Sequence, residues 1–121
     1  RQRQVPVVVV ETSRTRVEII REQGFAAVAG NAARTDIMDI ARLDCARWLF
    51  LTIPNGYESG EVAAAARGSR QDIAIIARAH YDDEVTYLTE HGADNVIMGE
   101  REIAESMANI LAAESSAPYA V

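Results

Sequence analysis

Glu11 is the residue of this sequence whose type and position suggest a chemical role most directly. It follows the valine-rich run Val5–Val10, which we expect to form a buried strand, and it precedes Ser13, a residue that can cap a helix. In a dinucleotide-binding fold, an acid at the end of the second strand accepts hydrogen bonds from the two ribose hydroxyls and repels a 2′-phosphate. The alternative is a solvated acid at a strand end. Glu11 is therefore a candidate ribose ligand.

Two turns that follow predicted strands carry further candidate groups. In the first, Gly30 and the small residues after it allow a flat base to approach the backbone, and the Asn31 amide can meet an adenine edge. In the second, Thr52 and Asn55 offer a hydroxyl and an amide at the carboxyl end of a strand, where ligands bind in such sheets. Ordinary turn chemistry is the alternative for both: an Asx motif at Asn31, and Pro and Asn-Gly as punctuation in the second turn.

Arg78 closes the apolar run Ile73–Ala77, at the carboxyl end of another predicted strand. An arginine in that position can meet a phosphate or a carboxylate, and the alternative is a pair with Asp82 or Asp83. The polar run 80–84 resembles a metal cluster in composition. Its spacing is too compressed for one helix face, and acids are favoured at a helix start in any case, so we predict no metal site there.

The composition excludes several classes of chemistry. All 12 basic residues are arginine, which rules out a Walker A lysine, a Schiff-base lysine and a Ser–Lys dyad. The lone Cys45 gives no intrachain disulfide, which suits a reducing compartment, and its place before the run Trp48–Ile53 suggests a packing role. No Ser/His/Asp or Cys/His set emerges. We therefore predict that the chain is not an enzyme.

The charge and hydropathy of the chain also restrict its partners. Its formal net charge is −6 and its pI about 4.8, which argues against DNA, RNA or an anionic lipid surface as the main partner. No apolar stretch approaches the ~18 residues of a membrane span. Its 121 residues are enough for one domain with a real core.

Apolar runs alternate with helix patterns along the whole chain. The runs are uniformly apolar, as is typical of strands buried on both faces of a parallel sheet, and they lie at Val5–Val10, Phe25–Ala29, Trp48–Ile53, Ile73–Ala77 and Val96–Met98. The helix patterns begin after caps at Ser13 and Thr35 and continue with Gly56–Arg67, Asp82–His91 and Glu100–Ala112, before a tail at 114–121 that we expect to be flexible. This order predicts an α/β fold, a Rossmann-type doubly wound parallel sheet.

The position of Glu11 makes Val5–Val10 the second strand of such a sheet. In the classic strand order 3-2-1-4-5-6 the first strand is central, so the strands seen here would form two groups, 3-2 and 4-5-6, with a gap between them. Exposed inner edges are unfavourable. Either more chain lies upstream, in which case residues 1–4 would end the missing helix, or another chain fills the gap, or the strand numbering is off by one.

Several segments together resemble one known family. They are Val-Val-Val-Glu-Thr-Ser, Ala-Gly-Asn-Ala, Leu-Thr-Ile-Pro-Asn, Ile-Ile-Ala-Arg-Ala and Gly-Ala-Asp-Asn-Val-Ile-Met-Gly-Glu. In order and spacing, from Val5 to Leu111, they resemble the TrkA-N family, also called the regulator-of-potassium-conductance (RCK) domain. The resemblance is greatest to the cytosolic C-terminal domain of Kef/YbaL-type cation:proton antiporters. It implies that residues 1–113 are a nucleotide-binding domain without its N-terminal strand and helix.

The resemblance implies a function and a set of ligand contacts. Such domains bind an adenine nucleotide, AMP or NAD(H), and gate a membrane cation transporter of the same polypeptide from the cytoplasmic face of the bacterial inner membrane; they usually form homodimers, often through their last helices. Carried over by position, Glu11 and Thr12 would contact the ribose, and Asn31, Ala32 and Ala33 would flank the adenine. Thr52, Ile53, Pro54 and Asn55 would lie along the ribose-phosphate side, and Arg78 would lie near the phosphate end.

One departure from the family pattern affects this expectation. The family's Gly-x-Gly-x-x-Gly turn, whose backbone amides grip the phosphate, has no counterpart here, so we expect weak or absent dinucleotide binding by this polypeptide alone. Asn31 also stands where many relatives have Asp. The cofactor-binding half of an NAD-dependent oxidoreductase is the alternative function, and it would need a substrate domain with a proton donor. A bare interaction scaffold would remain if no ligand binds.

Overall fold

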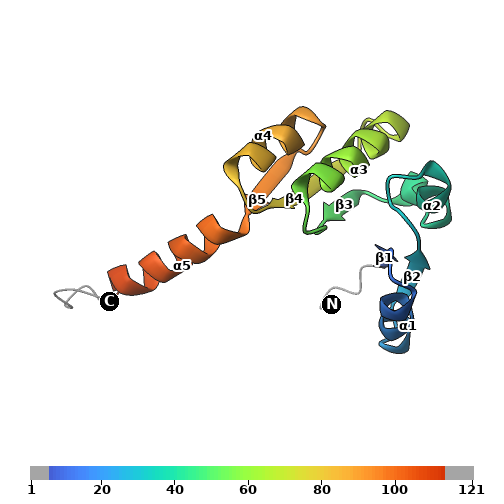
Figure 1. Cartoon of the computed structure of the whole chain (residues 1–121), viewed down its shortest axis with the longest axis horizontal. Coiled ribbons are helices and arrows are strands. Elements are labelled where there is room, and N and C mark those ends of the chain that lie inside the picture. Colours follow the sequence, from blue (N-terminus) through green and yellow to red (C-terminus); the bar gives the residue numbers. More distant parts are fainter. Residues whose placement is uncertain (1–5, 114–121) are drawn as a thin grey trace.

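A computed structural model of the protein describes residues 6–113, in which strands and helices alternate throughout (Figure 1). The strands are β1 (Val8–Glu11), β2 (Ala26–Ala29), β3 (Trp48–Leu51), β4 (Ala74–Ala79) and β5 (Asn95–Met98). The helices are α1 (Arg14–Glu22), α2 (Thr35–Ile40), α3 (Gly56–Ser69), α4 (Asp82–Glu90) and α5 (Gly99–Ala113), with a 3₁₀ helix, η1 (Leu43–Cys45), before β3. The α/β alternation predicted from the sequence is confirmed.

Local sequence signals set most helix ends. The Ser13 hydroxyl accepts a hydrogen bond from the Arg16 amide at the start of α1, as predicted. The chain leaves α1 through Gly24, whose φ of 92° suits glycine. The predicted cap at Thr35 is wrong by one position, since Thr35 is the first helical residue of α2 and Arg34 precedes it without a side-chain cap.

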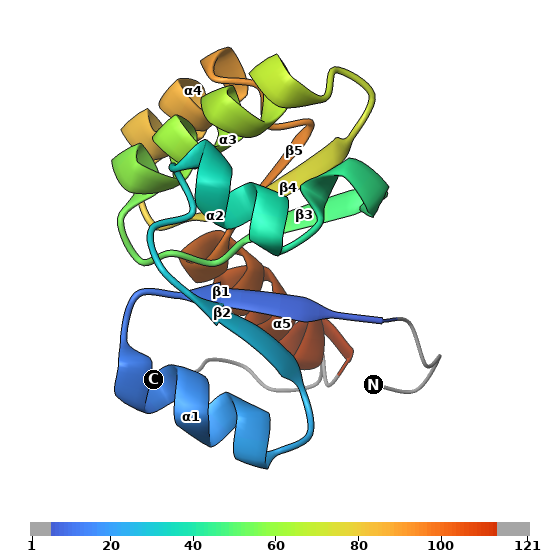
Figure 2. The ribbon, with the colours of Figure 1, turned by 90° about the vertical axis from the view of Figure 1, so that its right-hand side faces the viewer.

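The strands form two separate parallel sheets. β1 pairs with β2, with Glu11 opposite Ala29, and the other sheet has the order β3-β4-β5. Within residues 6–113 no hydrogen-bonded ladder joins β1 to β3. These are the two strand groups that the sequence predicted, with the gap at the same place. Figure 2 shows β1 and β2 below the three-stranded sheet, with its helices α3 and α4 above.

Several strand bounds differ from the predicted runs by two residues or more. β1 begins at Val8 and includes Glu11, whereas β3 stops at Leu51, so Thr52 and Ile53 lie in the loop that follows. β4 extends to Ala79, which places Arg78 inside the strand instead of after it. Val5, the helix end predicted at residues 1–4 and the tail predicted at 114–121 lie outside the described residues.

The core lies between the three-stranded sheet and helices α3 and α4. Ile75, Ala77 and Ala79 of β4 point into it together with Val62 and Ala63 of α3, and each is buried. Alanines and glycines let the two helices approach closely. This packing holds the carboxyl ends of β3 and β4, and the loops that follow them, in fixed positions.

The opposite face of the same sheet is bare among the described residues. Trp48 and Phe50 of β3 stack with their ring centroids 6.4 Å apart, yet each side chain is more than half exposed. Ile97 of β5 is also exposed, and α5, which projects away from the sheets in Figure 1, buries none of its residues. The prediction that the strands are buried on both faces is therefore wrong for this part of the chain, because no described element covers that face.

None of the helices in residues 6–113 combines the length and the hydropathy that a bilayer crossing requires.

Candidate functional site

The candidate ligand residues all lie at the carboxyl ends of strands. Glu11 ends β1 and Thr12 follows it, residues 31–33 follow β2, residues 52–55 follow β3, and Arg78 is the penultimate residue of β4. Within each parallel sheet these strand ends share one edge, which is where ligands bind in doubly wound folds. The fold therefore brings the candidates to two neighbouring pairs of strand ends.

Glu11 is held in place by its own turn. Its Oε2 accepts hydrogen bonds from the Ser13 amide (2.8 Å) and the Thr12 hydroxyl (3.2 Å), while Oε1 lies 3.5 Å from a guanidinium nitrogen of Arg16. The bond from the Ser13 amide is the main reason that the pKa of Glu11 lies below its usual value. Among the described residues, Oε1 of this ionised carboxylate has only the long contact with Arg16. It can therefore accept hydrogen bonds from ribose hydroxyls.

The turn after β2 has the Asx geometry that the sequence left open. Asn31 Oδ1 accepts a hydrogen bond from the Ala33 amide at 2.8 Å, and the Asn31 side chain is otherwise exposed. Because the oxygen is used by the backbone, the amide NH₂ of Asn31 points away as a donor. Ala32 and Ala33 are half-buried against the core. The turn is thus stable without a ligand and still presents one hydrogen-bond donor.

The loop after β3 is likewise fixed by its asparagine. Asn55 is the N-cap of α3, and its Oδ1 accepts hydrogen bonds from the amides of Tyr57 (2.8 Å) and Glu58 (3.3 Å). Thr52 and Pro54 are exposed, whereas Ile53 packs against the core. Turn chemistry therefore accounts for the position of Asn55, and its NH₂ group remains as a donor.

Arg78 does not pair with the acids that the sequence offered as its alternative partners. Asp82 binds Arg101 at 2.8 Å, and Asp83 accepts a 2.8 Å hydrogen bond from the Tyr57 hydroxyl. Arg78 is exposed on the bare face of the sheet, in register with Ile97. Its guanidinium makes no ion pair with another described residue.

Glu84 is a residue that the sequence reasoning missed as an organiser of this region. It is buried at the start of α4, where its Oε2 accepts a hydrogen bond from the Gly56 amide and its Oε1 accepts bonds from the amides of His80 and Tyr81. The bond from the His80 amide is the first cause of a pKa below the usual value for this acid, and it outweighs the effect of burial. The signal that could have found it is its place as the third residue of the helix, since a Glu there reaches back to the amide of the N-cap residue, here Tyr81.

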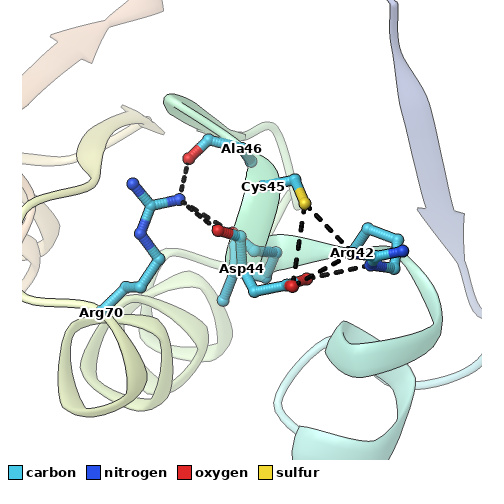
Figure 3. Close-up of polar contacts among 6 residues, drawn as sticks. Arg42, Asp44, Cys45, Ala46 and Arg70 are labelled. Carbon is cyan, nitrogen blue, oxygen red and sulfur yellow. Dashed lines mark hydrogen bonds and ion pairs between the residues drawn. The ribbon is translucent and has the colours of Figure 1, made fainter.

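The region before β3 corrects the expected packing role of Cys45, which is exposed. Figure 3 shows its Sγ beside the Arg42 guanidinium (3.2 Å) and the Asp44 carboxylate (3.7 Å). Arg70, from the end of α3, donates to the carbonyls of Asp44 and Ala46 and so fastens η1 to the core unit. An apolar run after a cysteine is therefore a weak signal, because the run starts only after the chain has turned through η1.

Comparisons with known proteins point to one domain family. Residues 1–99 match the TrkA-N domain. Over 107 residues, 88% of this chain, the sequence is 64% identical to YbaL of Escherichia coli K12, a protein assigned as a cation/proton antiporter. The chain spans about a fifth, 19%, of the length of that relative.

Solved structures support the same grouping. The crystal structure of the TrkA-N domain of the E. coli inner membrane protein YbaL matches with a TM-score of 0.84 at 64% identity, over 88% of this chain and 79% of that one. Two matches at 17% identity share the fold: the GsuK channel bound to NAD (TM-score 0.67, 93% of this chain and 24% of that one) and the Shewanella denitrificans Kef CTD in AMP-bound form (0.64, 83% and 75%). The chain therefore belongs to the TrkA-N domain family.

Proposed function

We propose that this chain is a nucleotide-binding regulatory domain of a membrane cation:proton antiporter, and that its ligand is an adenine nucleotide, AMP or NAD(H). The observation that carries the proposal is the 64% identity to YbaL over almost the whole described chain. The polar groups gathered at the strand ends support it, as do the NAD of the GsuK channel and the AMP of the Kef CTD. On this proposal the chain regulates transport and catalyses no reaction.

In the proposed complex, each candidate supplies the group that its geometry leaves available. Oε1 of Glu11, with Thr12 beside it, accepts the ribose hydroxyls, and a carboxylate there disfavours a 2′-phosphate. The NH₂ of Asn31 donates to the adenine edge, with Ala32 and Ala33 beside the base. The loop of Thr52, Ile53, Pro54 and Asn55 lies along the ribose and phosphate, and Arg78 provides charge for the phosphate end.

We further propose that a strand from outside residues 6–113 pairs between β1 and β3 and brings the phosphate-gripping turn with it. The unpaired edges on either side of the gap support this idea, since among the described residues β1 pairs with β2 alone and β3 with β4 alone. A two-stranded sheet alone is marginally stable in water. On this proposal the complete domain includes that strand, and strong nucleotide binding requires it.

The proposed partners are a membrane-embedded transporter domain of the same polypeptide and a second copy of the chain. Helix α5 supports a homodimer, because Ile103, Met107 and Ile110 form an exposed apolar stripe along it. The proposed location is the cytoplasmic face of the bacterial inner membrane, without direct lipid contact. The nucleotide would gate transport by binding one conformation of the assembly better than another.

A thermal-shift titration of the complete gene product tests this proposal. We expect AMP or NADH to raise the melting temperature in a saturable way, since a ligand that binds only the folded state stabilises it by about 2.7 kcal/mol at a hundredfold excess over Kd. NADPH should act more weakly than NADH because of the Glu11 carboxylate. Equal melting temperatures with and without every adenine nucleotide at millimolar concentration would refute the proposal.

A further inference from the structure

Glu84 stands apart from the other acids of the described chain because its side chain is buried, with 5% of the residue exposed. Its carboxylate lies between two loops that are distant in sequence. Oε2 accepts from the Gly56 amide at 2.9 Å, and Oε1 accepts from the amides of His80 at 2.7 Å and Tyr81 at 3.2 Å. Burying a carboxylate costs free energy unless hydrogen bonds compensate for the lost water, and the three backbone amides supply those bonds here.

The first loop carries the proposed ribose-phosphate contacts, and the second follows the end of β4, where Arg78 would meet the phosphate. Gly56 directly follows the loop 52–55, and His80 lies two residues after Arg78. The ladder between β3 and β4 fixes the strands themselves, and the carboxylate of Glu84 ties together the loops that follow them. A Cβ on Gly56 would come within 2.6 Å of the Glu84 Cδ, so the glycine is what lets the carboxylate reach the backbone.

The same contact changes what the start of α3 can bind. Helix N-termini attract phosphates through their free amides. Here the Gly56 amide is bound by Glu84, and those of Tyr57 and Glu58 are bound by the Asn55 side chain. The α3 N-terminus is thus already occupied by an anionic group of the protein and offers a nucleotide phosphate no free amide in its first turn.

We infer that Glu84 is a positioning residue of the proposed nucleotide site: its carboxylate ties the 52–55 loop to the loop that follows β4, and so keeps the 52–55 loop in place on the phosphate side of the ligand. The inference rests on the proposed function, because that function assigns the 52–55 loop to the phosphate side of the ligand. It makes a prediction whose sign is informative. Removing a negative charge near a phosphate should by electrostatics alone strengthen binding, whereas loss of positioning should weaken it.

A second carboxylate that joins segments distant in sequence, that of the exposed Asp94, provides the control. At the amino end of the same strands, Asp94 Oδ2 accepts hydrogen bonds from the Ile75 amide (2.8 Å) and from Arg67 (2.8 Å). This carboxylate also joins segments distant in sequence, but it lies at the edge of the sheet opposite the candidate ligand residues. Asp94→Asn therefore reports the effect of losing such a contact on folding alone.

The test measures AMP and adenosine binding by calorimetry on the complete gene product, well below the melting temperature of each variant. Gln in place of Glu84 presents an NH₂ to one of the backbone amides, so one loop is released. We expect Glu84→Gln to weaken AMP binding by about tenfold or more. Adenosine binding should weaken by less than about twofold, which is the scatter expected when a substitution does not affect the contacts of the ligand. Asp94→Asn should lower the melting temperature and leave both affinities unchanged.

Two further measurements keep the outcome interpretable. Gly56→Ala should displace the carboxylate and reproduce the selective loss of AMP affinity, and amide hydrogen exchange in Glu84→Gln should speed up at Gly56 and His80 but not at Ile75. Unchanged or tighter AMP binding by Glu84→Gln, in a protein whose wild type binds AMP, would overturn this inference alone. A wild type that binds no adenine nucleotide would overturn the proposed function and this inference together.

Discussion

At the residue scale, the candidate side chains are held by the backbone before any ligand arrives. Glu11, Asn31 and Asn55 each bind an amide of the next turn, which fixes their orientation and leaves a group available. Their residue types and positions were therefore enough to predict them as candidate ligand residues. Ordinary turn chemistry explains the positions of the same side chains equally well. The role of Glu84 was only partly predictable, because the amides of His80 and Tyr81 are close in sequence whereas the Gly56 amide is 28 residues away and reaches the carboxylate only through folding.

Arg78 offers a prediction at this scale. Arg78→Ala should weaken AMP by about 10- to 100-fold, because charge-assisted hydrogen bonds to a phosphate contribute about 1.5–3 kcal/mol. Adenosine, which lacks the phosphate, should bind almost unchanged. The exposed Arg47, which precedes β3 at the amino edge of the sheet, is the control, and Arg47→Ala should leave AMP binding intact. Calorimetry with both ligands checks this, and equal losses for AMP and adenosine would argue against a phosphate contact.

The buried carboxylate predicts how stability depends on pH. The pKa of Glu84 is lowered in the folded state, chiefly by the His80 amide, with the Gly56 and Tyr81 amides and the nearby His80 ring adding to the effect. A lowered pKa contributes stability above the unfolded value of 4.5, and that contribution is lost as pH falls through the folded pKa. Urea midpoints should therefore decline below about pH 4.5, and less steeply in Glu84→Gln. Identical slopes in the two proteins would contradict this account.

At the element scale, hydrophobic pattern and caps defined most of the fold, and their failures have physical causes. Alternation of apolar runs with helix patterns predicted the two strand groups and the gap, since β-α-β units of this length permit few topologies. Strand ends were less predictable: β4 includes Arg78 because the strand exposes alternate residues on the bare face. The 3₁₀ helix η1 was missed because its stability comes from Arg70, a residue distant in sequence.

The contact between α3 and α4 gives a second prediction. A Cβ at Gly60 would overlap the Tyr87 ring, whereas one at Gly68, in the same helix, would meet nothing within 4 Å. Gly60→Ala should therefore destabilise the fold by about 1–3 kcal/mol through overpacking. Gly68→Ala should stabilise it by about 0.4–1 kcal/mol, because alanine restricts the unfolded chain and favours helix. Denaturant unfolding measures both changes in stability. A Gly60→Ala variant that is more stable than wild type, or a Gly68→Ala variant that is less stable, would contradict the packing described.

At the scale of the whole molecule, the described residues leave more apolar surface uncovered than a self-contained domain would. The uncovered parts are the bare sheet face, the unpaired edges of β1 and β3, and the apolar stripe of α5. The sequence anticipated the gap but not the exposed face. Periodicity identifies which residues are apolar, but it does not reveal whether the covering element belongs to the same segment of chain.

The proposed dimer is tested on α5. Met107→Glu and Ile110→Glu place charges in the exposed apolar stripe and should convert a dimer into a monomer, measured by light scattering of the complete gene product after gel filtration. Asn109→Glu, an exposed polar position on the same helix, is the control and should leave the dimer intact. A wild type that is monomeric at micromolar concentration, or a Met107→Glu variant that remains dimeric, would rule out α5 as the dimer contact.

The most direct test of the central claim is cation-dependent proton flux in vesicles that contain the complete gene product, measured with and without AMP or NADH on the side of this domain. We predict a saturable change in flux that Glu11→Gln shifts to much higher nucleotide concentration, while Glu18→Gln on the exposed face of α1 behaves as wild type. Flux that is the same at every nucleotide concentration up to millimolar, in a transporter shown to be active, would contradict the claim that this domain is a nucleotide-responsive regulator.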